Sequence, residues 1–165
     1  MQITHLDSLI GVLTLVASDA GLTHVLFEDQ TPEDAGLPAD LPEDDQHPTL
    51  AEAAAQLGEY FDGDRKHFDL TLDLRGTDFQ QDAWRELAKI PYGETRSYGE
   101  QATAIGRPGS FRAVGAANGR NPIPIILPCH RIVGANGDLT GFAGGLDTKR
   151  QLLSHEQAQQ GLPGI

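Results

Sequence analysis

Cysteine is almost absent from the sequence, since Cys129 is the only one among 165 residues. A single thiol cannot form an intramolecular disulfide, so we expect a protein of a reducing compartment, the cytoplasm. Long apolar runs are absent as well, because none approaches the ~18 residues that a membrane-spanning helix requires. Residues 1–18 lack the basic segment and the small-residue cleavage site of a secretory signal. These absences exclude disulfide-dependent and membrane-spanning classes and favour an ordinary globular protein.

Basic residues are scarce too. Twelve Lys and Arg stand against 24 Asp and Glu, which gives a formal net charge of -12. The excess acid lies in the first half: residues 1–75 carry 16 acidic and 3 basic side chains (-13), whereas residues 76–165 carry 8 and 9 (+1). Between Arg96 and Arg131, five arginines accompany a single acidic residue, Glu100. This stretch is either a basic field for nucleic acid or a set of scattered arginines that solvate the surface.

The chain is expected to be an α/β protein with two parts, residues 1–75 and 76–165. The first part alternates β-branched and aliphatic runs with turns, which predicts a small strand-and-helix domain. Its acidic, proline-rich stretch, residues 29–48, is expected to be a solvated linker or a long loop. The elements predicted around it are a strand at 8–18, a hairpin partner at 22–28, a helix capped by Thr49 and a strand at 67–74.

The second part is predicted to be mainly helical. A helix capped by Asp78 comes first, and two short helices capped by Ser97 and Ser110 flank a turn at 106–109. Two short helices joined by a glycine-containing turn of about four residues are typical of a helix-turn-helix. Many helical hairpins never contact DNA, so the pattern alone leaves a packing role open. A final helix is predicted at 146–156.

The lone cysteine lies in an unusual local sequence, Leu127-Pro128-Cys129-His130-Arg131. By default such a cysteine is a small, buried and inert side chain. Pro128 excludes a helix here, and in a regular strand Cys129 and His130 would point to opposite faces. The imidazole can therefore serve the sulfur only if the chain turns or a water bridges the two groups. Glu156 is a candidate partner for the other ring nitrogen, although a glutamate near a helix end is most often solvated.

Residues 92–156 resemble the methylated-DNA–protein-cysteine methyltransferases, also called O6-alkylguanine-DNA alkyltransferases. The resemblance is carried by a Pro-Cys-His-Arg core at the family's spacing from an upstream Asn-Pro and a downstream Gly-Gly. The matching residues are Pro91-Tyr92-Gly93-Glu94, Ser97-Tyr98, Arg112-Ala113-Val114-Gly115, Asn121-Pro122, Ile126–Arg131, Gly141-Phe142-Ala143-Gly144-Gly145, Lys149 and Leu152-Leu153. The first half resembles the family only in its order of elements.

The resemblance implies direct repair of O6-alkylguanine, together with O4-alkylthymine, by irreversible transfer of the alkyl group to Cys129. The reaction occurs once per protein molecule. In this pattern His130 is a base that acts through water, and Glu156 is its partner. Asn121 orders the turn that presents the cysteine, and Tyr98 donates to the leaving guanine. The expected partner is double-stranded DNA that carries the lesion, and a monomer without a cofactor is expected to act on it.

The resemblance also assigns contacts to the substrate and to DNA. Groups around Ile132, Phe142 and Ala143 line the guanine pocket. Arg112 takes the place of the extruded nucleotide, and its helix approaches the minor groove through small residues. The DNA-binding residues implied in this way are Arg112, Ala113, Gly115, Ala116 and Arg120. A tightly packed helix crossing is the alternative explanation for the same small residues.

Two features depart from the family. Phe142 stands where some members have tyrosine, so that side chain has no hydroxyl to offer the base. The zinc site of some members uses cysteines, and a chain with one cysteine cannot build it, so no metal is expected. Two other functions remain: a non-catalytic alkyltransferase-like lesion binder, in which another residue replaces the cysteine, and a hydrolase that uses Cys129, His130 and Glu156. Repeated turnover would distinguish the hydrolase from a single-turnover acceptor.

Overall fold

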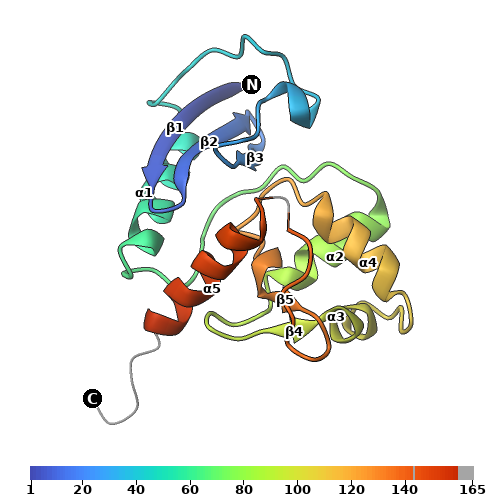
Figure 1. Ribbon diagram of the computed structural model, residues 1–165. Helices are drawn as coiled ribbons and strands as arrows, with labels where there is room; N and C mark the ends of the chain where they lie inside the picture. Colours follow the sequence, from blue (N-terminus) through green and yellow to red (C-terminus); the bar gives the residue numbers. More distant parts are fainter. Residues whose placement is uncertain (143, 160–165) are drawn as a thin grey trace. The chain divides into compact units, whose positions relative to one another are not determined.

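The computed structural model describes residues 1–142 and 144–159 and divides into two compact units, Met1–Arg75 and Gly76–Ile165 (Figure 1). The first unit contains an antiparallel sheet with the strand order β1-β2-β3 and one long helix, α1, that packs against the sheet. Its elements are β1 (Gln2–Ser8), β2 (Gly11–Ser18), β3 (Gly21–Leu26) and α1 (Pro48–Phe61). Fully buried leucines from the sheet and the helix form its core, among them Leu13, Leu15, Leu22, Leu50 and Leu57.

The strands of this unit differ from the prediction in two places. The apolar run at 8–18 is β2 together with the turn before it, and a further strand, β1, precedes that turn. Residues 67–74 form no strand and meet the sheet at a single parallel bridge between Leu22 and Leu72. There Leu22 N–H donates to Thr71 O at 2.9 Å, and Asp73 N–H donates to Leu22 O at 2.8 Å. The segment with alternating apolar residues thus pairs with the sheet through one bridge and not through a continuous ladder of hydrogen bonds.

The acidic stretch at 29–48 is a structured loop and not a solvated linker. Ile3 N–H donates to Pro42 O at 3.0 Å, and Ile3 O accepts from Asp44 N–H at 2.9 Å. The loop contains one short 3-10 turn, η1 (Glu33–Ala35). Its few apolar side chains join an apolar cluster on the sheet, which consists of Ile3, Val16 and Leu26 with Met1, Ala35, Leu37 and Leu41. The loop therefore covers part of the sheet while most of its acidic side chains stay exposed.

The second unit is mainly helical, and the predicted mixed α/β class with a helical second half is confirmed (Figure 1). Its helices are α2 (Asp78–Leu87), α3 (Tyr98–Ala104), α4 (Phe111–Gly119) and α5 (Leu146–Gln159). The short strands β4 (Arg96–Ser97) and β5 (Ile132–Val133) pair in parallel, and η2 (Cys129–Arg131) is a 3-10 turn between α4 and β5. Within the described residues, no helix combines the length and the apolar character needed to cross a membrane.

Buried polar bonds fix the helix-turn-helix formed by α3 and α4. Gln101 on α3 and Asn118 on α4 exchange side-chain amide bonds of 2.9 and 2.8 Å. Gln101 Nε2 also donates to Ala83 O on α2 at 3.0 Å, and Trp84 Nε1 donates to Ala117 O at 2.7 Å. Each bond is buried, so each is costly to break without a replacement partner. The exposed surface of α4 therefore has a defined orientation on α2 and α3.

Helix caps follow the sequence prediction only in part. Ser97 caps α3 as predicted and forms a reciprocal capping box with Glu100. Ser110 occupies the N-cap position of α4, but its side chain makes no capping bond. The caps of α1 and α2 are His47 and Thr77, which lie two residues and one residue before the predicted positions.

Candidate active site

Residues 121–128 lead into a 3-10 turn, η2, that begins at the lone cysteine. Arg131 N–H donates to Pro128 O at 3.0 Å and closes η2, so Cys129 begins a 3-10 turn and not a strand. Ile125 has a φ of 76°, the one positive value at a non-glycine residue in the described part of the chain. A left-handed conformation costs a β-branched residue on the order of 1–3 kcal/mol. The turn that presents Cys129 is therefore held against an unfavourable backbone geometry.

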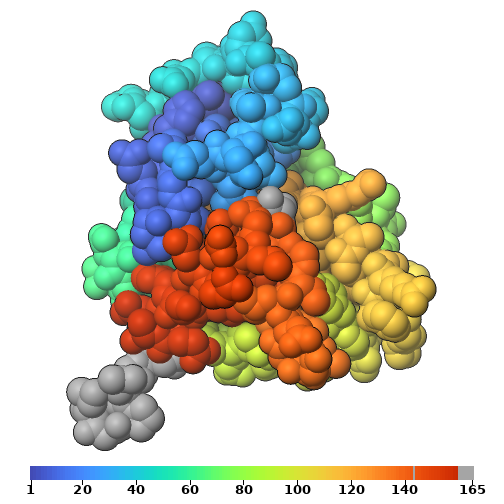
Figure 2. Space-filling model, in the orientation of Figure 1, coloured from blue at the N-terminus to red at the C-terminus, as the bar shows by residue number. Residues whose placement is uncertain are grey.

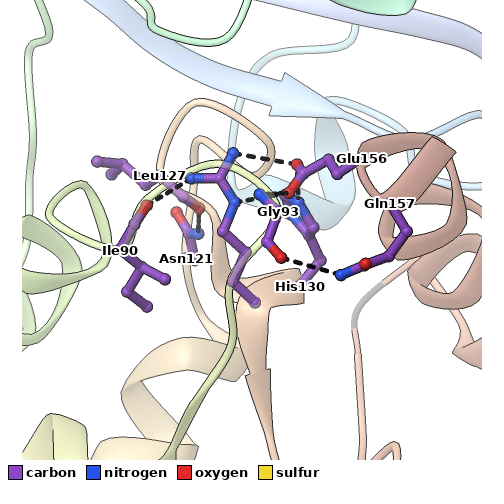
Figure 3. Close-up of polar contacts among 8 residues, drawn as sticks. Ile90, Gly93, Asn121, Leu127, His130, Glu156 and Gln157 are labelled. Carbon is purple, nitrogen blue, oxygen red and sulfur yellow. Dashed lines mark hydrogen bonds and ion pairs between the residues drawn. The ribbon is translucent and has the colours of Figure 1, made fainter. Parts of the chain in front are cut away.

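Asn121 supplies side-chain bonds that hold this turn. Its Nδ2 donates to Leu127 O at 2.7 Å (Figure 3). Its Oδ1 accepts from Ile123 N–H at 2.9 Å. The Asn121 amide also lowers the pKa of the Cys129 thiol, which favours the thiolate. These are the contacts that a residue needs in order to hold the turn and place the sulfur.

Cys129 is buried, with 8% of its surface exposed. Burial raises the pKa of the Cys129 thiol to about 11, and the Asn121 hydrogen bond and the charge of Lys149 offset only part of this effect. The sulfur is therefore protonated at neutral pH in this state. A nucleophilic thiolate requires that a neighbouring base take the proton.

Glu156 lies at the centre of a buried network, and both of its oxygens are bonded (Figure 3). Its Oε1 accepts from Arg131 Nε at 2.9 Å and from Gly93 N–H at 3.2 Å. Its Oε2 lies 2.6 Å from His130 Nε2 and accepts from Arg131 Nη2 at 3.1 Å. Burial alone would raise the pKa of Glu156, but the hydrogen bonds and charges of His130 and Arg131 outweigh it and hold the pKa far below its usual range. Glu156 is thus a buried carboxylate and not a solvated one.

His130 is fully buried beside the cysteine. The contact with ionised Glu156 assigns the ring proton to Nε2, which leaves a lone pair on Nδ1. Within the described residues this Nδ1 is buried and has no hydrogen-bond partner. Burial lowers the pKa of His130 below its ordinary value, although Glu156 acts in the opposite direction. The ring is therefore neutral at pH 7, and its open lone pair makes it a proton acceptor.

Two charged residues of this site are missing from the sequence-based assignment. Arg131 is 5% exposed, and its Nη1 donates to Ile90 O at 2.6 Å in addition to the bonds to Glu156. Lys149 on α5 is 1% exposed, and its Nζ donates to Thr140 O at 3.1 Å. Burial lowers the pKa of Lys149, and its interaction with Cys129 acts in the opposite direction. Both residues lie in the matching motifs, but only the folded chain shows that their charges point inward.

The structure also corrects the predicted basic field from Arg96 to Arg131. Arg131 is inside the protein, and Arg96 Nη2 donates to Glu94 Oε1 at 3.1 Å. The arginines of this field that remain exposed are Arg107, Arg112 and Arg120.

Tyr98, the first residue of α3, lines a pocket of about 330 Å³. Its hydroxyl lies 2.6 Å from Thr140 Oγ1. A Cβ atom at Gly115 would lie 3.6 Å from the Tyr98 ring, so glycine leaves this side of the ring open. The lining residues are Tyr98, Phe111, Gly115, Gly119, Thr140 and Gly141.

The three residues predicted to line a guanine pocket are placed differently. The Ile132 side chain is fully buried in β5, and its N–H donates to Cys129 O. Phe142 is half-buried and follows the pocket residue Gly141. Ala143 lies outside the described residues.

Helix α4, which carries four of the five predicted DNA-binding residues, lies on the surface of the second unit (Figure 2). Arg112, Ala113 and Ala116 are exposed, as is Arg120 just after the helix, while Gly115 is half-buried. A shallow pocket of about 300 Å³ between α2 and α4 is lined by Thr77, Phe79, Gln80, Ala113, Ala116, Ala117 and Arg120. Among residues 1–142 and 144–159, no three His, Cys, Asp or Glu side chains gather as a metal ion would require.

A buried cysteine beside an imidazole–carboxylate pair, with a helix-turn-helix in the same unit, points to a DNA-binding protein that acts through a thiol. Comparison with known families agrees. Residues 78–158 match the model of the 6-O-methylguanine DNA methyltransferase DNA-binding domain, and residues 1–74 match that of the family's ribonuclease-like domain.

Individual relatives are similar over nearly the whole chain. The methylated-DNA–protein-cysteine methyltransferase of Mycolicibacterium paratuberculosis is 53% identical over 92% of this chain and 89% of its own, and that of Methanosarcina barkeri is 48% identical over 92% and 94%. A structure of Mycobacterium tuberculosis OGT in complex with DNA superimposes with a TM-score of 0.87 at 48% identity, over 96% of this chain and 94% of its own. The chain belongs to the 6-O-methylguanine DNA methyltransferase family.

Proposed function

We propose that the protein repairs O6-alkylguanine in double-stranded DNA by irreversible transfer of the alkyl group to Cys129, and that O4-alkylthymine reacts in the same way. One observation carries the proposal: the buried thiol follows an ordered turn and precedes a neutral imidazole whose Nδ1 is buried and open. A thioether is not readily hydrolysed, so each molecule reacts once. The site side chains named above all come from residues 76–165, so a single copy of the chain can carry out the transfer. We place this monomer in the cytoplasm.

The reaction is an in-line displacement at the alkyl carbon. The Cys129 proton passes through one water molecule to His130 Nδ1, and Glu156 stabilises the imidazolium that forms. The sulfur–carbon bond forms as the bond from carbon to O6 breaks, and the electron pair of that bond passes to guanine. Tyr98 donates a hydrogen bond to the departing guanine anion, and Thr140 holds the hydroxyl in position. The anion takes up a proton from solvent, and His130 returns to solvent the proton that it took from Cys129.

The DNA contact is assigned to α4. Ala113 and Ala116 are exposed and small, which lets the helix backbone approach a minor groove closely. The target base lies inside a duplex and must be extruded before the sulfur can reach it. Arg112 is exposed at the start of α4, and we assign to it the role of filling the gap that the base leaves.

Intact-mass analysis after incubation with an O6-methylguanine duplex tests the proposal. We expect one methyl group per chain, on the peptide that contains Cys129, and none in Cys129→Ser. The Glu94→Gln variant, which changes an exposed carboxylate outside the site, is the matched control and should react like the wild type. More than one repaired base per chain would identify a hydrolase instead, and no transfer at all would leave a lesion binder.

A further inference from the structure

Phe111 is an exposed aromatic side chain at the first position of α4. Half of its surface (50%) is accessible to water, and it is the one aromatic among the large exposed apolar residues of the described chain, the others being Leu9 and Leu146. An apolar ring at a helix start gains nothing from water. Its position therefore points to a contact that forms when a partner binds.

The ring lies at a specific place, the lining of the Tyr98 pocket. The pocket wall includes Phe111 and Tyr98 together with Gly115. The glycine adds no side chain to the pocket, so the space beside the Tyr98 ring stays open. A planar base that approaches the Tyr98 hydroxyl from α4 thus passes the Phe111 ring.

Arg112 lies beside this ring. Its Cζ is 5.9 Å from the centroid of Phe111, within the range of a cation–π contact. No ion pair with a carboxylate is formed by Arg112 within the part of the chain that the structure describes. The two side chains therefore stand together at the start of α4, one charged and one apolar.

We propose that Phe111 is a stacking surface for the nucleobase that leaves the duplex, at the mouth of the Tyr98 pocket, while Arg112 occupies the vacated space. The proposal rests on the proposed function. Extrusion costs the stacking energy of the target base, and an aromatic ring at the exit restores part of it because every base has a stacking face. Phe111 is a positioning residue in this scheme, because the transfer itself uses other groups.

Two substrates separate positioning from chemistry: a duplex that carries O6-methylguanine, and free O6-benzylguanine, which needs no extrusion. For Phe111→Ala we expect a rate of transfer from the duplex about tenfold lower, the size of a single base–aromatic stack. The rate with the free base should stay within about twofold of the wild type, and the melting temperature should not fall. Phe111→Tyr should keep the duplex rate, whereas Phe111→Leu, which is apolar but not planar, should lose most of it. Leu9→Ala removes an equally exposed apolar side chain from the other unit and should change neither rate.

Three outcomes would overturn the inference. Equal losses on both substrates would place Phe111 in the pocket or the fold. A wild-type duplex rate in Phe111→Ala would show that the ring does not meet the base. If the wild type self-associated and Phe111→Ala did not, with the rate of repair unchanged, Phe111 would be a contact between copies of the chain. Failure of the proposed function gives a different result, because wild type would then transfer no alkyl group from either substrate.

Discussion

Replacement of Glu156 by glutamine should both destabilise the protein and slow alkyl transfer. The carboxylate accepts from Arg131, His130 and the Gly93 N–H with both oxygens, whereas an amide has one acceptor oxygen and would turn its NH2 group toward donors. The Arg131 guanidinium would then stay buried without a counter-ion. Removal of one partner from a buried pair costs about 3–5 kcal/mol, and the free energy of unfolding of Glu156→Gln should fall by that amount.

Alkyl transfer should slow for a separate reason. His130 loses the acceptor that fixes its proton on Nε2, and the loss of such an orienting partner typically costs about 10–100-fold in activity. The double variant Arg131→Met, Glu156→Gln separates the two effects. Removal of both charges of a buried pair is often neutral for stability, so the free energy of unfolding of the double variant should be close to that of the wild type. The rate of alkyl transfer should stay low.

Urea unfolding and single-turnover transfer from labelled duplex measure the two quantities. If Glu156→Gln were as stable as the wild type, the buried pair of Arg131 and Glu156 would not contribute to stability as argued. If the double variant reacted at the wild-type rate, Glu156 would not act on His130. The pH dependence has a defined sign. The folded pKa of Glu156 is depressed, so its stabilisation is present above the unfolded value of about 4.3 and is lost as the pH falls toward the folded value. The stability gap between wild type and Glu156→Gln should therefore narrow below about pH 4.

Three further predictions follow from the site and from α4. The pKa of Cys129 is about 11 in the folded protein and about 8.5 in the unfolded chain. The contribution of Cys129 to stability is therefore complete below about pH 8.5 and is lost as the pH rises toward about 11, so the stability of wild type relative to Cys129→Ala should fall over this range. A pH-independent difference in urea unfolding would contradict this. Lys149→Met should slow alkyl transfer without a loss of thermal stability, because the buried ammonium group gains an ionised partner only when Cys129 becomes a thiolate; an unchanged rate would remove Lys149 from the reaction. With Arg107 and Arg120 as the exposed phosphate contacts, the log–log salt slope of duplex affinity should be about -2, and a slope near -4 would require contacts outside α4 and its turn.

The sequence is a good guide to this protein where the chemistry is local. Pro128 and the neighbouring histidine indicate a turn or a bridging water at Cys129, and the Ser97 cap and the glycine-containing turn predict the helix-turn-helix. These features depend on a few consecutive residues. They therefore form independently of the segments that pack against them.

Prediction fails where burial decides the outcome. Arg131 looks like a surface charge until α5 brings Glu156 against it, 25 residues further along the chain. The strained φ of Ile125 has no signature in the sequence, because a β-branched residue is normally extended. The segment at 67–74 shows strand periodicity, but only the folded sheet shows that a single bridge is available to it.

The loop at 29–48 has a consequence for the sheet it covers. Its hydrogen bonds to Ile3 lie along the free edge of β1, and the bonds of residues 71–73 to Leu22 lie along the free edge of β3. An open strand edge can pair with another chain and start aggregation. In a sheet of three strands, both edges are partly occupied by segments that contribute no strand of their own. Shortening the loop would therefore free backbone donors and acceptors for pairing between molecules, and its acidic side chains, which repel a second copy, would be lost in the same change.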